Sequence, residues 1–184
     1  MSLTRKLGPI DRIVVVDEGP HSTMIADGRS PDVRTDPARP GFSCARMWVT
    51  DRTPIRLAGV RESLHLPHTY VPPAGGSTCY VVTFPPDASW RGTVGAREVA
   101  AHFATMGAPG ISSHSAQAPH PYMQRASTLD FCLVLDGEIT LVLDTEEVDL
   151  TAGDTVVQRG TNHAWSNRSD RPCVIAFSSH DAKA

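Results

Sequence analysis

The sequence predicts an all-β fold, a sandwich or barrel with one short helix. Two observations predict it. Short runs rich in β-branched and aromatic residues recur along the chain, and they are most frequent after residue 122. Turn-forming Gly, Pro, Asn and Asp residues separate these runs at intervals of about 8–12 residues, which is typical of sandwiches and barrels.

The first half of the chain, residues 1–93, predicts an arm that contains strands. Three β-branched runs, 12–16, 44–50 and 78–84, are joined by connections rich in Pro and Gly. Such connections mark turns and loops rather than a separate domain.

One helix is expected over 94–107. Gly107 is a suitable C-terminal cap, because glycine adopts the left-handed conformation that ends many helices. His102 is predicted to be an ordinary histidine at the surface or its boundary. Three apolar residues at helical spacing form the face that should pack on the core: Val99, Phe103 and Met106.

The stretch 122–179 is expected to form the barrel core. Asp136-Gly137 is a strong signal for a hairpin turn between a strand over 129–135 and a return strand over 138–143. Further short strands are expected over 148–150, 155–158, 163–167 and 172–178. The whole chain, 1–184, is therefore predicted to be a single domain.

Composition excludes several function classes. The chain has 184 residues and a net charge of −3, so it lacks the basic surplus of a nucleic-acid-binding protein. No apolar run reaches the ~18 residues of a membrane span. Only Lys6 and Lys183 could form a Schiff base, and their places near the chain ends argue against lysine-based aldolase or pyridoxal chemistry. No organic cofactor is expected. We expect a cytoplasmic protein that acts on a small molecule, with neither a nucleic-acid nor a membrane partner.

The stretch 153–167 carries a recognisable motif. Gly153 precedes a short strand, Gly160 turns the chain, and His163 is followed four residues later by Asn167. This pattern resembles the second motif of the cupin superfamily, in particular small proteins with one conserved barrel. The resemblance implies a jelly-roll β-barrel that encloses a small-molecule pocket.

The first cupin motif is present in an altered form. Counting back from Gly137 places Asp130 at the usual glutamate, and Gln124 and Ala126 at the two usual histidines. Cupins typically bind iron, manganese, zinc or nickel through three histidines and one glutamate, and the resemblance keeps only His163 unchanged. Asp130 can still ligate, Gln124 is a weak ligand, and Ala126 cannot bind metal.

Two ligand sets therefore stay open. Gln124 would complete a metal site with His163 and Asp130, or His120 would do so from four residues upstream. A set of His120, Asp130 and His163 has the ligand types of the two-histidine, one-carboxylate iron sites. The alternative is that no metal is bound.

Strand alternation adds candidate substrate contacts. Asp130, Cys132 and Val134 share one face of their strand, and Trp165 shares a face with His163. Arginines flank two motif positions and could hold a substrate carboxylate, although surface ion pairing is commoner. The candidates for substrate binding are Arg125, Cys132, Val134, Arg159 and Trp165.

Three functions remain in order of preference. The first is a metal-independent enzyme in which His163 and Asp130 move protons and Gln124 orients an oxygenated organic substrate, in a dehydration, isomerisation or decarboxylation. The second is a metal-dependent oxygenase or lyase with an unusual ligand set. The third is a cupin that binds a small molecule without catalysis. A homodimer is expected, since an arm strand can add to a neighbour's sheet.

Overall fold

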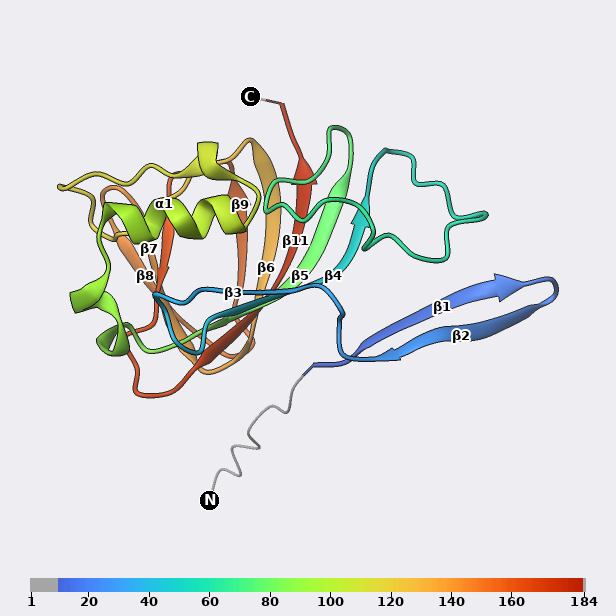
Figure 1. Ribbon diagram of the computed structural model, residues 1–184, viewed down its shortest axis with the longest axis horizontal. Helices are drawn as coiled ribbons and strands as arrows, with labels where there is room; N and C mark the ends of the chain where they lie inside the picture. Colours follow the sequence, from blue (N-terminus) through green and yellow to red (C-terminus); the bar gives the residue numbers. More distant parts are fainter. Residues whose placement is uncertain (1–9, 184) are drawn as a thin grey trace, which may run out of the picture.

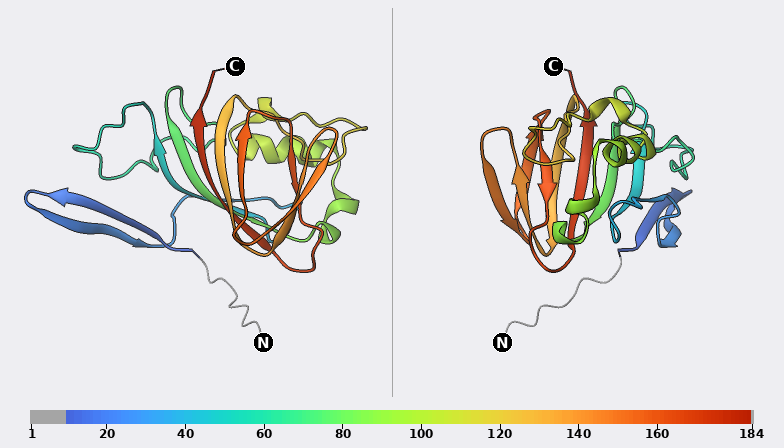
Figure 2. Two further views of the ribbon diagram at one scale, coloured as in Figure 1. Left: turned by 180° about the vertical axis from the view of Figure 1, so that it is seen from behind. Right: turned by 60° about the vertical axis from the view of Figure 1, so that its left-hand side comes forward.

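The computed structural model describes residues 10–183, so residues 1–9, with Lys6, and residue 184 lie outside the described part. Two antiparallel sheets face each other and enclose the core (Figures 1 and 2). The larger sheet has six strands in the order β3 (Val33–Thr35), β4 (Ser43–Thr50), β5 (Ser77–Phe84), β11 (Cys173–Asp181), β6 (Thr128–Asp136) and β9 (Thr155–Arg159). The smaller has the order β10 (Ala164–Ser166), β7 (Glu138–Val142) and β8 (Glu147–Thr151). The predicted all-β architecture with one short α-helix is confirmed.

The core lies between the two sheets. Ile175, Val82 and Cys132 point inward from the larger sheet, and Ile139 and Leu141 meet them from the smaller one. In β6 the exposed Phe131 and Leu133 alternate with buried residues, as a strand with one covered face requires. The strand periodicity in the sequence therefore identified the inward face correctly.

Asp136-Gly137 does not close a hairpin, and this corrects the prediction. β6 pairs with β11 and β9, whereas β7 pairs with β8 and β10. The turn carries the chain from one sheet to the other. Gly137 has a φ of +84°, and a Cβ there would stand 2.9 Å from the Cα of Cys173. Glycine is needed here because the two backbone segments come so close. The sequence therefore predicted the turn correctly but not the pairing of the strands on either side of it.

The helix α1 (Ala96–Thr105) forms where it was predicted. Val99, Phe103 and Met106 are all buried, and Gly107 follows with a φ of +65°. His102 is only 4% exposed, so its prediction as a surface or boundary residue is wrong. Three short 3-10 turns flank the helix: Asp87–Ser89, Arg91–Thr93 and Pro109–Ile111.

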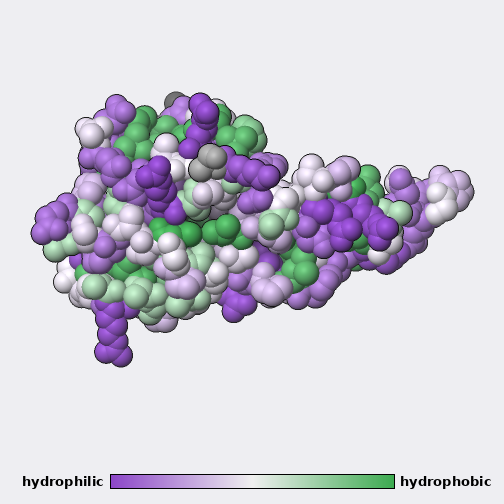
Figure 3. Space-filling model, turned by 90° about the horizontal axis from the view of Figure 1, so that it is seen from above, coloured by the Kyte–Doolittle hydropathy of each residue, from purple (hydrophilic) through white to green (hydrophobic). Residues whose placement is uncertain are grey.

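A hairpin of β1 (Arg12–Glu18) and β2 (His21–Gly28) projects from the body (Figure 1). β2 and the short β3 were not predicted, because neither carries a dense β-branched run. Seen from above, the projecting part has a mixed surface of polar and scattered apolar side chains (Figure 3). Ile13, Val15 and Met24 are more than half exposed on it. The expected homodimer stays a prediction. In residues 10–183, no helix is long and apolar enough to cross a membrane.

Asn167 is a structural residue of the 153–167 motif. It is fully buried, and its amide nitrogen donates to the carbonyl oxygens of Phe84 at 2.9 Å and Arg171 at 2.8 Å. Its side-chain oxygen accepts from the hydroxyl and the backbone amide of Ser169. These bonds tie the end of β5 to the turn before β11 and keep the larger sheet in register beside the pocket.

Candidate functional site

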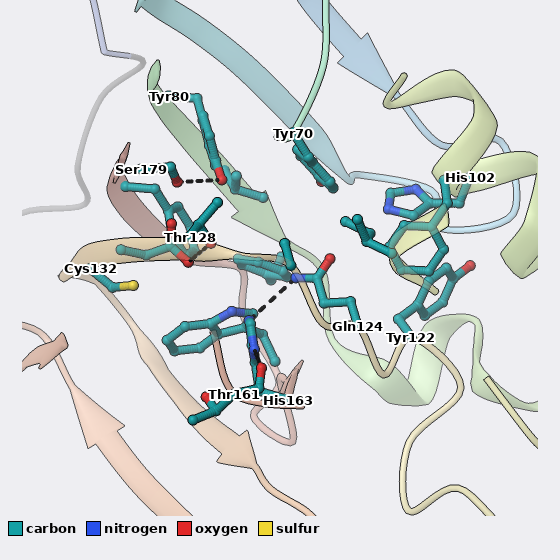
Figure 4. Close-up of a pocket in the computed structure, with 18 of the residues that line it drawn as sticks. Tyr70, Tyr80, His102, Tyr122, Gln124, Thr128, Cys132, Thr161, His163 and Ser179 are labelled. Carbon is teal, nitrogen blue, oxygen red and sulfur yellow. Dashed lines mark hydrogen bonds between the residues drawn. The ribbon is translucent and has the colours of Figure 1, made fainter. Parts of the chain in front are cut away.

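A pocket opens into the barrel between the two sheets. Its wall comes from β5, β6, β10 and β11, from the helix over 96–105, from the segments 122–126 and 160–163, and from the loops before and after β4. All four positions that the first and second motifs assign to metal ligands lie on this wall: Gln124, Ala126, Asp130 and His163. Figure 4 shows Gln124 and His163 facing each other, with His102 and Tyr122 on one side of them and Tyr80, Thr128 and Ser179 on the other.

His163 is held in one orientation by its neighbours. Its backbone forms two hydrogen bonds with Gln124, at 2.8 and 3.0 Å, in an antiparallel bridge. Its Nδ1 lies 2.9 Å from the carbonyl oxygen of Thr161. A carbonyl can only accept, so Nδ1 carries the proton in the neutral ring and Nε2 keeps its lone pair. The Gln124 amide nitrogen lies 3.4 Å from that Nε2, a long contact.

The electrostatics favour a neutral His163. Burial lowers its pKa, and the Thr161 carbonyl and the charge of Asp130 oppose this effect only in part. Nε2 is therefore available as a proton acceptor at neutral pH. The negative charge of Asp130 also favours the imidazolium once a proton has been taken up.

Two polar atoms on the wall that solvent does not reach lack hydrogen-bond partners within residues 10–183. Asp130 accepts from the Thr128 hydroxyl at 3.0 Å through Oδ2, but its buried Oδ1 is unpartnered. The indole N–H of Trp165 is buried and unpartnered as well. Buried polar groups are normally satisfied, so unpaired atoms on a pocket wall are candidates for ligand contact.

One side of the pocket is aromatic. Tyr70 stacks on Tyr80 with ring centroids 5.7 Å apart, and Tyr80 stacks on Phe177 at 5.2 Å. Trp165 meets Phe177 edge to face at 5.6 Å. The Tyr80 hydroxyl lies 3.1 Å from that of Ser179. A flat apolar body would be complementary to this wall.

A buried polar cluster that the sequence did not reveal closes the other end. Asp36 accepts hydrogen bonds from Arg39 Nε at 2.9 Å, from the Tyr122 hydroxyl at 3.2 Å and from the Ala38 backbone amide at 2.9 Å, and His102 Nδ1 lies 3.2 Å away. The Arg39 guanidinium lies 3.7 Å from the Tyr122 ring centroid and 4.0 Å from that of Phe42. Asp36 and Arg39 are three residues apart, but His102 and Tyr122 reach them only through tertiary packing, so no local signal could have found the whole cluster.

Two pKa shifts follow from the cluster. Burial raises the pKa of Asp36, but the hydrogen bond from His102 and the charge of Arg39 outweigh it and hold the pKa well below its usual range. Burial lowers the pKa of His102 to about 4, against the hydrogen bond to Asp36. The cluster therefore holds one ion pair and one neutral imidazole at neutral pH.

The structure brings together only some of the residues predicted for the site. Gln124, Asp130, Cys132, His163 and Trp165 line the pocket. Arg125 and Arg159 are exposed outside it, which corrects their prediction as substrate contacts. Arg159 stands opposite Leu129 on the outer face of the sheet, and Arg125 is adjacent to the inward Gln124. Val134 lies in the packed core and not on the pocket wall.

His120 lies elsewhere. It is buried beside Trp90, with its Nε2 3.5 Å from Asp87 Oδ2. It does not line the pocket that holds Asp130 and His163. Its prediction as a ligand with them is therefore corrected: the loop turns this ring toward the 3-10 turn at 87–89 instead.

The chain is similar to known proteins. A Cupin domain model matches residues 114–179. The chain is 35% identical over 155 residues to phomopsin biosynthesis cluster protein C' of Diaporthe leptostromiformis, covering 76% of this chain and 75% of that relative. The chain belongs to the cupin superfamily. It is also 58% identical over 48 residues to phomopsin biosynthesis cluster protein D of the same fungus, 26% of this chain and 25% of that relative.

One solved structure shows a weak similarity. The Cupin 2 conserved barrel domain protein of Salinispora arenicola is 14% identical, with a TM-score of 0.39, over 77% of this chain and 76% of that one. The matched Cupin domain segment contains Gln124, Asp130 and His163.

The donor set of this cupin does not fit the usual metal of the superfamily. At the four positions that the motif resemblance assigns to metal ligands it has one imidazole, one carboxyl, one amide and one methyl group. Across the described residues, no three His, Cys, Asp or Glu side chains are grouped so that they could hold a metal ion. First-row metals prefer imidazole and carboxylate ligands, and a catalytic site commonly has three protein ligands. We therefore derive no chemical step through a metal.

Proposed function

We propose that this cupin is an enzyme that moves protons on a small oxygenated organic molecule bound in the barrel pocket. His163 is the base, Asp130 stabilises its protonated form, and Gln124 orients the bound molecule. One observation carries the proposal: the Nε2 lone pair of a neutral His163, contacted only by the Gln124 amide at 3.4 Å, and the unpartnered Oδ1 of Asp130 belong to the wall of one pocket.

The reaction class follows from these groups. His163 Nε2 removes a proton from a carbon next to a carbonyl group, and the electron pair of that C–H bond moves to the carbonyl oxygen. The N–H groups of Gln124 and Trp165 are suited to donate to the oxygen as it becomes negative. The imidazolium then returns its proton. Delivery to another carbon completes an isomerisation, and delivery to a departing hydroxyl releases water.

The relative supports a setting in small-molecule metabolism. Its name places it in a phomopsin biosynthesis cluster, and the match extends over three quarters of both chains. A role in the biosynthesis of a small organic compound is consistent with the pocket.

Solvent hydrogen exchange tests the proposal without the natural substrate. A panel of carbonyl compounds, including phenylpyruvate, acetylacetone and dihydroxyacetone, would be incubated with the full chain in D₂O and followed by proton NMR. We expect faster loss of the proton next to the carbonyl for at least one compound. His163→Gln should reduce that acceleration by about 10²–10⁴-fold, the usual contribution of general acid–base catalysis.

Two outcomes would contradict the proposal. An acceleration that is unchanged in His163→Gln would assign the chemistry to another group. Compounds that bind without any acceleration would instead favour the non-catalytic binding cupin. Arg125→Gln is the matched control, because Arg125 neighbours Gln124 in sequence but is exposed outside the pocket.

A further inference from the structure

We propose that Arg39 forms a binding site for one carboxylate of the substrate, so that this cupin acts on an organic acid with a flat apolar body. The inference rests on the proposed function only in using the same pocket. It concerns the binding of the carboxylate, so it can be tested separately from proton transfer.

The donors of Arg39 are only partly used. A guanidinium has five N–H groups. Nε donates to Asp36 at 2.9 Å, and Nη2 donates to the His102 ring at 3.1 Å. Nη1 has no hydrogen-bond partner among residues 10–183, although the side chain is 97% buried and lines the pocket. Two N–H groups of Nη1 and one of Nη2 therefore remain, and they form the fork that binds a carboxylate through two parallel hydrogen bonds.

The surroundings hold this fork in place. Asp36 occupies the opposite edge of the guanidinium, and the rings of Phe42 and Tyr122 cover its two faces. An arginine held in this way loses little side-chain freedom when a ligand binds. A new partner can therefore reach the guanidinium only at Nη1 and at the outer N–H of Nη2.

The charge balance favours a single carboxylate over a phosphate. Asp36 already compensates the charge of Arg39, and burial keeps His102 neutral. No other lysine or arginine lines the pocket within the described part of the chain, and Asp130 adds a carboxyl to the wall. A phosphate group brings about −1.5 to −2 charges and would find too little compensation here.

The position suits the proposed chemistry. Figure 4 shows His102 and Tyr122, which contact Arg39, on one side of Gln124 and His163, while Tyr80, Thr128 and Ser179 lie on the other. A carboxylate on Arg39 would anchor one end of a molecule, and its body would extend past His163 along the stacked rings of Tyr70, Tyr80 and Phe177.

Fluorine NMR tests the inference with defined probes. Binding of 4-fluorophenylacetate to the full chain would be compared with that of its neutral amide and of 4-fluorobenzylphosphonate. We expect the carboxylate to bind about tenfold or more tightly than the amide, because hydrogen bonds to a charged partner are stronger. It should also bind more tightly than the phosphonate and shift the Arg39 side-chain N–H signals in arginine-labelled protein.

A neutral double variant isolates the role of Arg39. Asp36→Asn/Arg39→Met removes both charges and leaves no buried charge alone, and it should bind acid and amide equally. Arg12→Met/Glu62→Gln is the matched control, since it removes another buried arginine and its carboxylate outside this pocket and should keep the preference. If the double variant does not fold, the wild-type chain tests the inference through its preference for the acid over the amide and through the shift of its Arg39 N–H signals.

Four results would overturn the inference: equal binding of acid and amide to the wild-type chain, tighter binding of the phosphonate, a preference that persists in Asp36→Asn/Arg39→Met, or no binding of the acid at all. His163→Gln should keep the preference for the acid. Loss of proton exchange with a retained acid preference would therefore contradict the proposed function but leave the Arg39 site intact.

Discussion

The two ends of the pocket use buried polar groups in opposite ways. At the Asp36 end, the carboxylate accepts several hydrogen bonds and its charge is paired with Arg39. At the Asp130 end, one carboxyl oxygen and the Trp165 N–H have no partner in the described chain. Satisfied groups fix the shape of a site, whereas unsatisfied groups are free to contact a ligand. The comparison separates the Asp36 carboxylate, which holds Arg39 and its end of the pocket in place, from the groups proposed to act in proton transfer.

The same substitution at both ends gives the largest expected contrast. Asp36→Asn leaves the buried Arg39 charge without a partner and should lower the free energy of unfolding by about 3–5 kcal/mol. Asp130→Asn removes a single hydrogen-bonded carboxyl and should change it by about 1 kcal/mol or less. Urea unfolding of both variants at pH 7 measures the difference. An equal loss of unfolding free energy in both variants would contradict the difference described between the two ends.

Acid pH should weaken the Asp36 end through His102. The pKa of His102 is about 4 in the folded chain, below the ordinary value of 6.5. The unfolded chain therefore binds a proton at a higher pH than the folded one, and stability should fall as the pH drops from about 6.5 to 4. The loss from His102 alone is about 3 kcal/mol.

Urea unfolding across this range measures the pH effect. The buried His68, His120 and His163 also have lowered pKa values and act in the same direction. His102→Asn should make the pH dependence shallower, while the same change at the exposed His65 should leave it unaltered. A stability that is flat between pH 6.5 and 4 would contradict the burial of these rings as neutral groups.

The smallest effects are expected at the arginines outside the pocket. Arg125 and Arg159 are both exposed, so replacing either with Gln should change stability by no more than about 0.5 kcal/mol. Probe binding should be unchanged too. Calorimetric melting and fluorine NMR on the two variants measure both effects. Weaker binding of the acid by either variant would contradict the assignment of the carboxylate site to Arg39.

The ends also differ in how far the sequence predicts them. Asp130 and His163 lie within one contiguous region, and strand alternation with the spacing of the two motifs indicated that both face inward. Asp36, His102 and Tyr122 meet only through tertiary packing, and none has a local pattern that marks it as buried and paired. For the same reason Asp136-Gly137 was identified as a turn while its strand pairing was not, since pairing depends on distant strands.

The protonation state of His163 tests the central claim most directly. Long-range nitrogen–proton NMR on histidine-labelled protein at pH 7, assigned by the loss of signals in His163→Gln, distinguishes the two neutral tautomers from the imidazolium. We expect a neutral ring with the proton on Nδ1, held by the Thr161 carbonyl, and no proton on Nε2. A proton on Nε2 at pH 7, in either the other tautomer or the imidazolium, would contradict His163 as the base.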